Sequence, residues 1–157
     1  MIQSIVSAIQ KLVDNKFKKN NKELLPFMRS YSSTGTFIIR VILGVIFLAH
    51  GLDKFQSGIG NIEGFFASLG IPAYMATVVA IIEIVGGIAL IIGLGTRIAS
   101  LVLGIVLVVA IFQAKLGMGF LGGYELDIAL LAMAVHLALS GSSLLSVDSL
   151  FSKKNKA

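Results

Sequence analysis

Glu83 occupies the position in this sequence that most needs a chemical explanation. It lies within the stretch VVAIIEIVGGIALIIGLG and is the only charged residue between Pro72 and Gly95. Because an ionised carboxylate is costly inside a bilayer, intramembrane charges usually face the bundle interior and often serve function. Two interpretations remain open. Glu83 is either a structural carboxyl, protonated or hydrogen-bonded to His50, or a group that binds a ligand or handles protons.

Other polar residues fall at nearly the same depth as Glu83. With a helix rise of about 1.5 Å per residue, counted from the cytoplasmic ends assigned below, His50 lies about 21 Å along its helix and Glu83 about 18 Å along the next. Gln113 lies at about 24 Å by the same rise. We therefore expect a polar cluster in the outer half of the bundle, with four charged residues at its outer mouths: Asp53, Lys54, Glu125 and Asp127.

Arg40 and His136 fall in the inner half of the bundle, at about 6 Å and 6 to 9 Å. The two histidines, His50 and His136, thus differ in height by on the order of 12 Å, which argues against a bis-histidine haem. No His/Glu pair with the spacing of a carboxylate-bridged metal site recurs on facing helices. The chain has no cysteine, which excludes thiolate chemistry of its own. No nucleotide-binding glycine motif is present, and no flavin, haem or metal site is evident.

The composition is that of a membrane protein, so these groups must be positioned by membrane-spanning helices. The 157 residues are 56% hydrophobic and 13% charged, with a mean hydropathy of +0.93. A bilayer-crossing helix needs about 20 mostly apolar residues. Four segments meet that need, with approximate ends: residues 36–55, 72–95, 97–114 and 125–140.

The N-terminal region is predicted to lie on the membrane rather than to cross it. Apolar residues recur at helical spacing over residues 2–17, whereas residues 18–35 form a polar connector interrupted by Pro26. The predicted fold is an all-α four-transmembrane-helix bundle preceded by an amphipathic interfacial helix. Its parts are residues 1–35, the membrane domain 36–151 and a basic tail 152–157.

Lysine and arginine set the expected orientation. Six basic residues precede the first span, Arg97 lies between the second and third, and three lysines close the chain, whereas the opposite loops carry only Lys54 and Lys115. By the positive-inside rule, both termini of this multi-pass cell-membrane protein should be cytoplasmic. The net charge of +5 is better explained by this rule and by anionic lipid than by nucleic acid.

Helical projection places small residues on the same faces as the polar ones. In the second span one face carries Ala76, Val79, Ala80, Glu83, Gly87 and Leu90, and in the first span one stripe carries Arg40, Gly44, Phe47, Gly51 and Lys54. Small residues allow membrane helices to approach closely. We expect these two faces to line the interior of the bundle.

Several of these stretches resemble the DoxX family of small four-helix membrane proteins. They are RVILGVIFLAHGLDKF at 40–55, IEIVGGIALIIGLGTR at 82–97, the acidic start of the fourth span at Glu125, and SGSSLLSVDSLF at 140–151. The resemblance covers residues 36–151. Gln113 and Lys115 stand where many members carry histidine. The resemblance implies a membrane partner of oxidoreductases in quinone-related and oxidative-stress systems, without implying an activity of its own.

A quinone binding site is one hypothesis that these residues support. A quinone is apolar apart from its carbonyls, so its pocket needs small-residue walls and one or two donors. His50 would donate to a quinone oxygen while Glu83 relays protons, and Lys54, Gln113, Glu125 and Arg40 are further ligand-binding candidates. Electrons would come from a partner oxidoreductase. The alternatives are a proton or cation carrier, which would require a homo-oligomer, and a non-catalytic membrane assembly factor.

Overall fold

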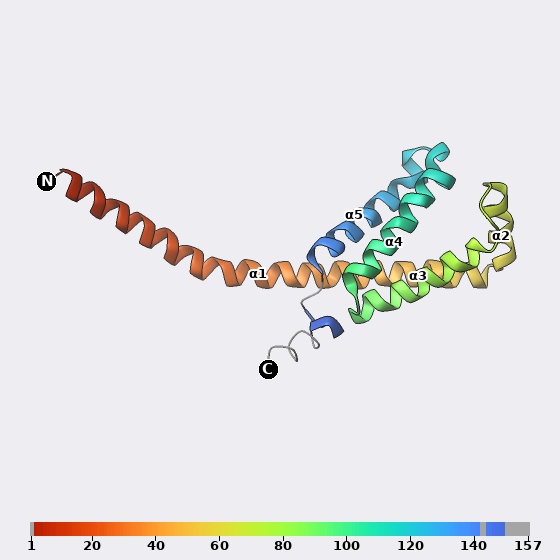
Figure 1. Ribbon diagram of the computed structural model, residues 1–157, viewed down its shortest axis with the longest axis horizontal. Helices are drawn as coiled ribbons and strands as arrows, with labels where there is room; N and C mark the ends of the chain where they lie inside the picture. The colour runs from red at the N-terminus through yellow and green to blue at the C-terminus, as the bar shows by residue number, and fades with distance from the viewer. Residues whose placement is uncertain (1, 142–143, 150–157) are drawn as a thin grey trace. The chain divides into compact units, whose positions relative to one another are not determined.

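The computed structural model describes residues 2–141 and 144–149, and within them every regular element is a helix. The chain divides into two compact units, residues 1–35 and 36–157. Figure 1 labels the α-helices α1 (Ile2–Gln56), α2 (Ile59–Ser68), α3 (Met75–Ile92), α4 (Thr96–Ala110) and α5 (Glu125–Ser140). Three short helices join α4 to α5: the π-helix η1 (Ile111–Lys115), the 3₁₀-helix η2 (Leu116–Met118) and the π-helix η3 (Phe120–Tyr124).

Four helical segments are long and apolar enough to cross a membrane, which confirms the predicted spans within the described residues. They are Ser32–Gln56, Met75–Ile92, Thr96–Met118 and Phe120–Ser140. The fourth carries a kink, because Leu121 and Gly122 have non-helical backbone angles, and α5 itself begins at the predicted Glu125. The fold is therefore all-α with four candidate membrane-spanning helices.

The N-terminal segment differs from the predicted short helix followed by a connector. α1 is one continuous helix from Ile2 to Gln56, so the structure shows no separate amphipathic helix. Pro26 does not end the helix, because a proline removes one hydrogen bond and strains a helix without always breaking it. Lysine, glutamate and leucine around it are good helix formers, so the polar composition of residues 18–35 does not prevent a helix.

The predicted small-residue faces bring α1 and α3 into close contact. A Cβ atom at Gly44 would lie 2.8 Å from the carbonyl oxygen of Gly87, and one at Gly51 would lie 2.9 Å from that of Ala80. Larger side chains at these glycines would force the two backbones apart. The buried positions of α3 are Ala76, Ala80, Glu83, Gly87 and Leu90, which are five of the six predicted.

The interior of the bundle is a leucine-rich cluster to which α1, α3, α4 and α5 all contribute. Its members are Leu43, Phe47, Leu90, Leu103, Leu107, Leu130, Ala134 and Leu137. Large apolar side chains such as Ile98, 72% exposed, and Leu139, 74% exposed, point outward. In a bilayer such side chains meet lipid, so the helices associate through packing rather than through the hydrophobic effect.

Arg40 joins the end of the bundle opposite α2 to the C-terminal segment. The side chain is completely buried, and its guanidinium donates to the carbonyl oxygens of Leu144 at 3.3 Å and Leu145 at 2.7 Å. Asp148 accepts from the backbone N–H groups of Gly95 at 2.8 Å and Thr96 at 3.1 Å. Asp148 therefore caps the start of α4.

Candidate functional site

A cavity of about 480 Å³ lies among the helices at the end of the bundle where α2 is found. Its walls are mainly apolar and come from α1, α2, α3, α4 and α5, with Phe47, Ile82 and Leu130 among them. Small-molecule pockets in proteins commonly have about 300–1,000 Å³ and a few polar groups set in apolar walls. This cavity has six polar side chains: His50, Lys54, Glu83, Gln113, Lys115 and Asp127.

Glu83 forms an ion pair with Lys54 across the α1–α3 contact. The Nζ atom of Lys54 lies 2.5 Å from Oε2 of Glu83, and the two side chains are 19% and 8% exposed. The lysine ammonium also donates to the backbone carbonyl oxygen of His50 at 3.5 Å. Glu83 is thus buried, as expected for a charged residue inside the bundle. Its partner in the described structure is Lys54, whereas one interpretation of the sequence predicts a hydrogen bond to His50.

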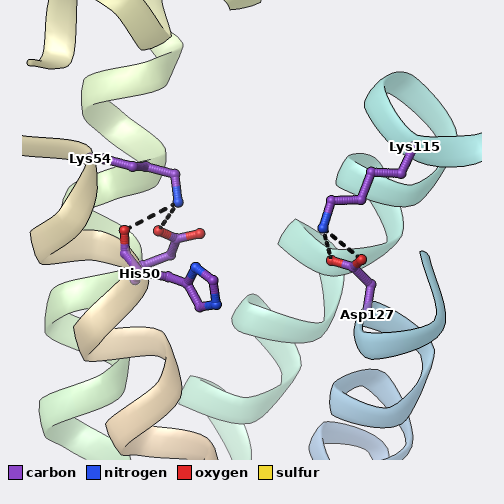
Figure 2. Close-up of polar contacts among 5 residues, drawn as sticks. His50, Lys54, Lys115 and Asp127 are labelled. Atoms are coloured by element: carbon purple, nitrogen blue, oxygen red, sulfur yellow. Dashed lines mark hydrogen bonds and ion pairs between the residues drawn. The ribbon is translucent and has the colours of Figure 1, made fainter. Parts of the chain in front are cut away.

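His50 and Gln113 line the same cavity from α1 and η1. Figure 2 shows the imidazole of His50 extending from its helix toward the side on which Lys115 and Asp127 lie. The structure therefore brings His50, Glu83 and Gln113 to one cavity, as their estimated depths predicted, and adds Lys54, which was expected at the outer mouths. Whether any of them binds a ligand stays a prediction.

A second ion pair in the cavity was not predicted from the sequence. The Nζ atom of Lys115 in η1 lies 2.7 Å and 3.0 Å from the two carboxylate oxygens of Asp127 in α5 (Figure 2). Asp127 is 8% exposed at its side chain and Lys115 is 36% exposed. Opposite charges at the facing ends of two neighbouring spans were a usable signal. Sequence reasoning placed Asp127 at the outer mouth but gave Lys115 no partner.

Two predicted site residues lie elsewhere. Glu125 is exposed, does not line the cavity and accepts from the backbone N–H of Gly122 at 3.1 Å. Arg40 lies at the opposite end of the bundle, bound to the C-terminal segment. Neither contributes to the cavity in the described structure.

α2 supplies a wall of the cavity that was not predicted, because the sequence analysis predicts no element between the spans at 36–55 and 72–95. Ile62, Phe65 and Phe66 of this helix line the cavity together with Leu69 and Ile71 that follow it. The hydroxyl of Thr77 in α3 donates to the Glu63 carboxylate at 2.9 Å, which holds α2 against the bundle. An apolar helix across one end can shield a ligand from water.

Comparison with known proteins supports the resemblance seen in the motifs. The DoxX family model matches residues 35–116, which include Glu83 and four more of the cavity's six polar residues. The chain belongs to the DoxX family. No solved structure matches it.

Named relatives of this DoxX protein come from several bacteria. It is 45% identical over 122 residues to "Putative oxidoreductase CatD" of Bacillus subtilis, covering 78% of this chain and 90% of the relative. It is 34% identical to "Uncharacterized membrane protein Rv3486" of Mycobacterium tuberculosis, with 76% and 82% covered. It is 25% identical to "Inner membrane protein YqjF" of Escherichia coli, with 81% and 99% covered. The DoxX chain is accordingly a multi-pass protein of the cell membrane.

Proposed function

We propose that the cavity of this DoxX protein binds a quinone-like ligand and that the protein acts as the membrane component of an oxidoreductase system. The observation that carries this proposal is an apolar cavity whose polar groups are two ion pairs, one histidine and one glutamine. Flat apolar rings suit the walls, and carbonyl oxygens suit ammonium and imidazole donors. The name of the Bacillus subtilis relative, an oxidoreductase, agrees with a redox role.

The chemistry assigned to the chain is proton supply rather than electron supply. Reduction of a quinone to a quinol takes two electrons and two protons. A partner oxidoreductase provides the electrons, since the chain has no cysteine and its sequence has no evident flavin or haem site. His50 donates to one quinone oxygen, and Glu83 with Lys54 passes protons to it from the α2 end of the cavity.

Ligand binding can be tested directly with 2-methyl-1,4-naphthoquinone and the protein purified in lipid nanodiscs. Calorimetric titration should show saturable binding to the unaltered protein. Val106→Trp should abolish it, because Val106 lines the cavity and the indole would occupy the ligand's space. Ile98→Trp is the matched control, because Ile98 is 72% exposed on the outer surface. Equal binding by both variants would show that the quinone occupies another place.

Proton handling can be separated from binding by Glu83→Gln. Glutamine keeps the size of the side chain and an acceptor for Lys54 but carries no proton. We expect the variant to bind the naphthoquinone. A deletion strain that carries this variant should grow less well over a series of quinone concentrations than one that carries the unaltered protein. His50→Gln should behave in the same way. Full protection by Glu83→Gln at matched membrane levels would end the proton-relay proposal.

Further measurements distinguish this proposal from the other classes of function. Ion flux through proteoliposomes without quinone binding would indicate a carrier. A soluble reductase that co-purifies with a ligand-free protein would indicate an assembly factor. Mass spectrometry of ligands retained in mild detergent would identify a bound quinone without prior choice of probe.

The N-terminal residues 2–17 are proposed to bind the membrane surface through their apolar stripe. The periodic apolar residues support this role, because an amphipathic stretch of α1 with flanking lysines suits an anionic membrane surface. Deleting residues 1–22 should leave a chain that still inserts into the membrane and is monodisperse, because the membrane domain, residues 36–151, and the tail, residues 152–157, are unchanged. Failure of the shortened chain to insert would mean that the segment is needed for folding.

A further inference from the structure

The Lys115–Asp127 pair faces the cavity from the side opposite the Lys54–Glu83 pair. Lys54 and Glu83 belong to α1 and α3, whereas Lys115 and Asp127 belong to η1 and α5, and all four residues line the same space. Figure 2 shows Lys54 and His50 on one side of the view and Lys115 with Asp127 on the other, with the His50 ring directed toward the second pair. The cavity thus has a polar group on each of two sides and apolar walls between them.

The backbone around Lys115 is shaped in a way that aims its side chain. η1 is a π-helix, in which the wider turn shifts the direction of the residues that follow Ala110. Single π-turns inside α-helices occur frequently at functional sites. Gln113, from the same turn, also lines the cavity. The π-turn therefore presents two polar side chains to the cavity in succession.

The Lys115–Asp127 pair is not needed merely to hold the connection between α4 and α5 together. That connection has its own contacts, because the Glu125 carboxylate accepts from Gly122 N–H and the rings of Phe120 and Tyr124 meet edge to face with centroids 5.6 Å apart. Asp127 is buried, and burying its carboxylate has a desolvation cost that apolar residues joining the same two elements would avoid. Charges retained inside a membrane domain commonly mark function.

We propose that the Lys115–Asp127 pair is a second polar anchor of the cavity, so that the ligand carries oxygen acceptors at two opposite ends, as a para-quinone does. This inference rests on the proposed function and narrows its ligand class. An ammonium has three N–H donors. Two contacts are recorded for each lysine, with Glu83 and the His50 carbonyl for Lys54 and with both oxygens of Asp127 for Lys115. One N–H of each remains for a ligand oxygen.

Two probes of similar size distinguish a ligand with two anchors from one with a single anchor. 2-Methyl-1,4-naphthoquinone has carbonyls at both ends of one ring, whereas 1-tetralone has a fused two-ring skeleton with one carbonyl. Lys115→Met/Asp127→Leu removes the anchor without leaving a buried charge. We expect this variant to bind the naphthoquinone at least tenfold more weakly than the unaltered protein does, because a hydrogen bond to a charged group is lost. Its affinity for 1-tetralone, held by Lys54 and His50, should stay the same.

Controls keep the result specific. Arg97→Gln also removes one positive charge but lies outside the cavity, and it should bind both probes like the unaltered protein. Thermal unfolding in detergent checks that the double variant is folded. If the double variant is not recovered from membranes, Lys115→Met alone gives the same readout, because methionine has no N–H donor, with the same expected loss for the naphthoquinone alone.

The outcomes separate this inference from the proposed function. If the unaltered protein binds neither probe, the quinone proposal falls and the second anchor falls with it. If the unaltered protein binds the naphthoquinone and the Lys115 variants bind it equally well, the ligand uses one anchor only and this inference is overturned while the proposed function stands. An equal loss of both probes would also overturn it, because the pair would then shape the cavity rather than contact one carbonyl.

Discussion

Lys54 and Glu83 form an ion pair between two membrane-spanning helices, with their charged atoms 2.5 Å apart. The two side chains are 19% and 8% exposed, so little water reaches the pair. Lys54 begins one helical turn beyond His50, about 6 Å farther along the axis, and its side chain returns toward the carboxylate. The pair therefore joins the α2 end of the cavity to the middle of α3.

This pair leads to a prediction about stability. Removing one partner of a buried ion pair commonly costs about 3–5 kcal/mol, whereas replacing both with apolar residues is often neutral. Lys54→Met should therefore lower the thermal unfolding temperature in detergent more than Lys54→Met/Glu83→Leu does. A double variant no more stable than Lys54→Met alone would show that the pair does not couple α1 to α3.

The close approach of α1 and α3 predicts a steric effect. Gly44→Ala should destabilise the bundle by about 1–3 kcal/mol, because its Cβ would lie 2.8 Å from the Gly87 carbonyl oxygen. Gly104→Ala is the matched control, since its nearest neighbour would lie 3.7 Å away, an ordinary contact. Denaturation of both variants in detergent measures the difference. Equal stability of the two would mean that α1 and α3 can separate at little cost.

The Asp148 cap predicts a smaller loss at the opposite end. Asp148→Ala removes the acceptor for the N–H groups of Gly95 and Thr96 and should cost about 0.5–2 kcal/mol. Asp53→Ala, at an exposed carboxylate on α1, should change stability much less. Hydrogen exchange at the start of α4 should rise in the first variant alone. Unchanged exchange there would show that the cap does not hold this turn.

The orientation of the chain can be measured with single cysteines, because the natural sequence has none. If both termini are cytoplasmic, Ser57→Cys in the connection before α2 should react with an impermeant thiol reagent applied to intact cells. Ser152→Cys, in the tail outside the described residues, should react only after lysis. The reverse pattern would invert the proposed orientation.

The four spans and the buried face of α3 could be predicted because apolar length and helical periodicity are local properties of the sequence. Glu83 stands out for the same reason. Lys54 could not be predicted as its partner, because the height of a residue along a helix axis says little about where the end of a long lysine side chain lies. The Lys115–Asp127 pair could not be predicted, because it depends on a π-turn, and a helical projection with a constant angle per residue does not include the change of direction at such a turn. The cavity wall formed by α2 could not be predicted either, because it depends on the tertiary contacts of a helix too short to cross a membrane.

The bond between Arg40 and the backbone oxygens of Leu144 and Leu145 has a consequence for the order of assembly. These residues are 104 and 105 positions apart in the chain. At a synthesis rate of roughly 5–20 residues per second, the arginine is made about 5–20 s before its two acceptors. The bonds between Arg40 and this segment can therefore form only after Leu144 and Leu145 have been synthesised, so the first span lacks these two bonds for that interval.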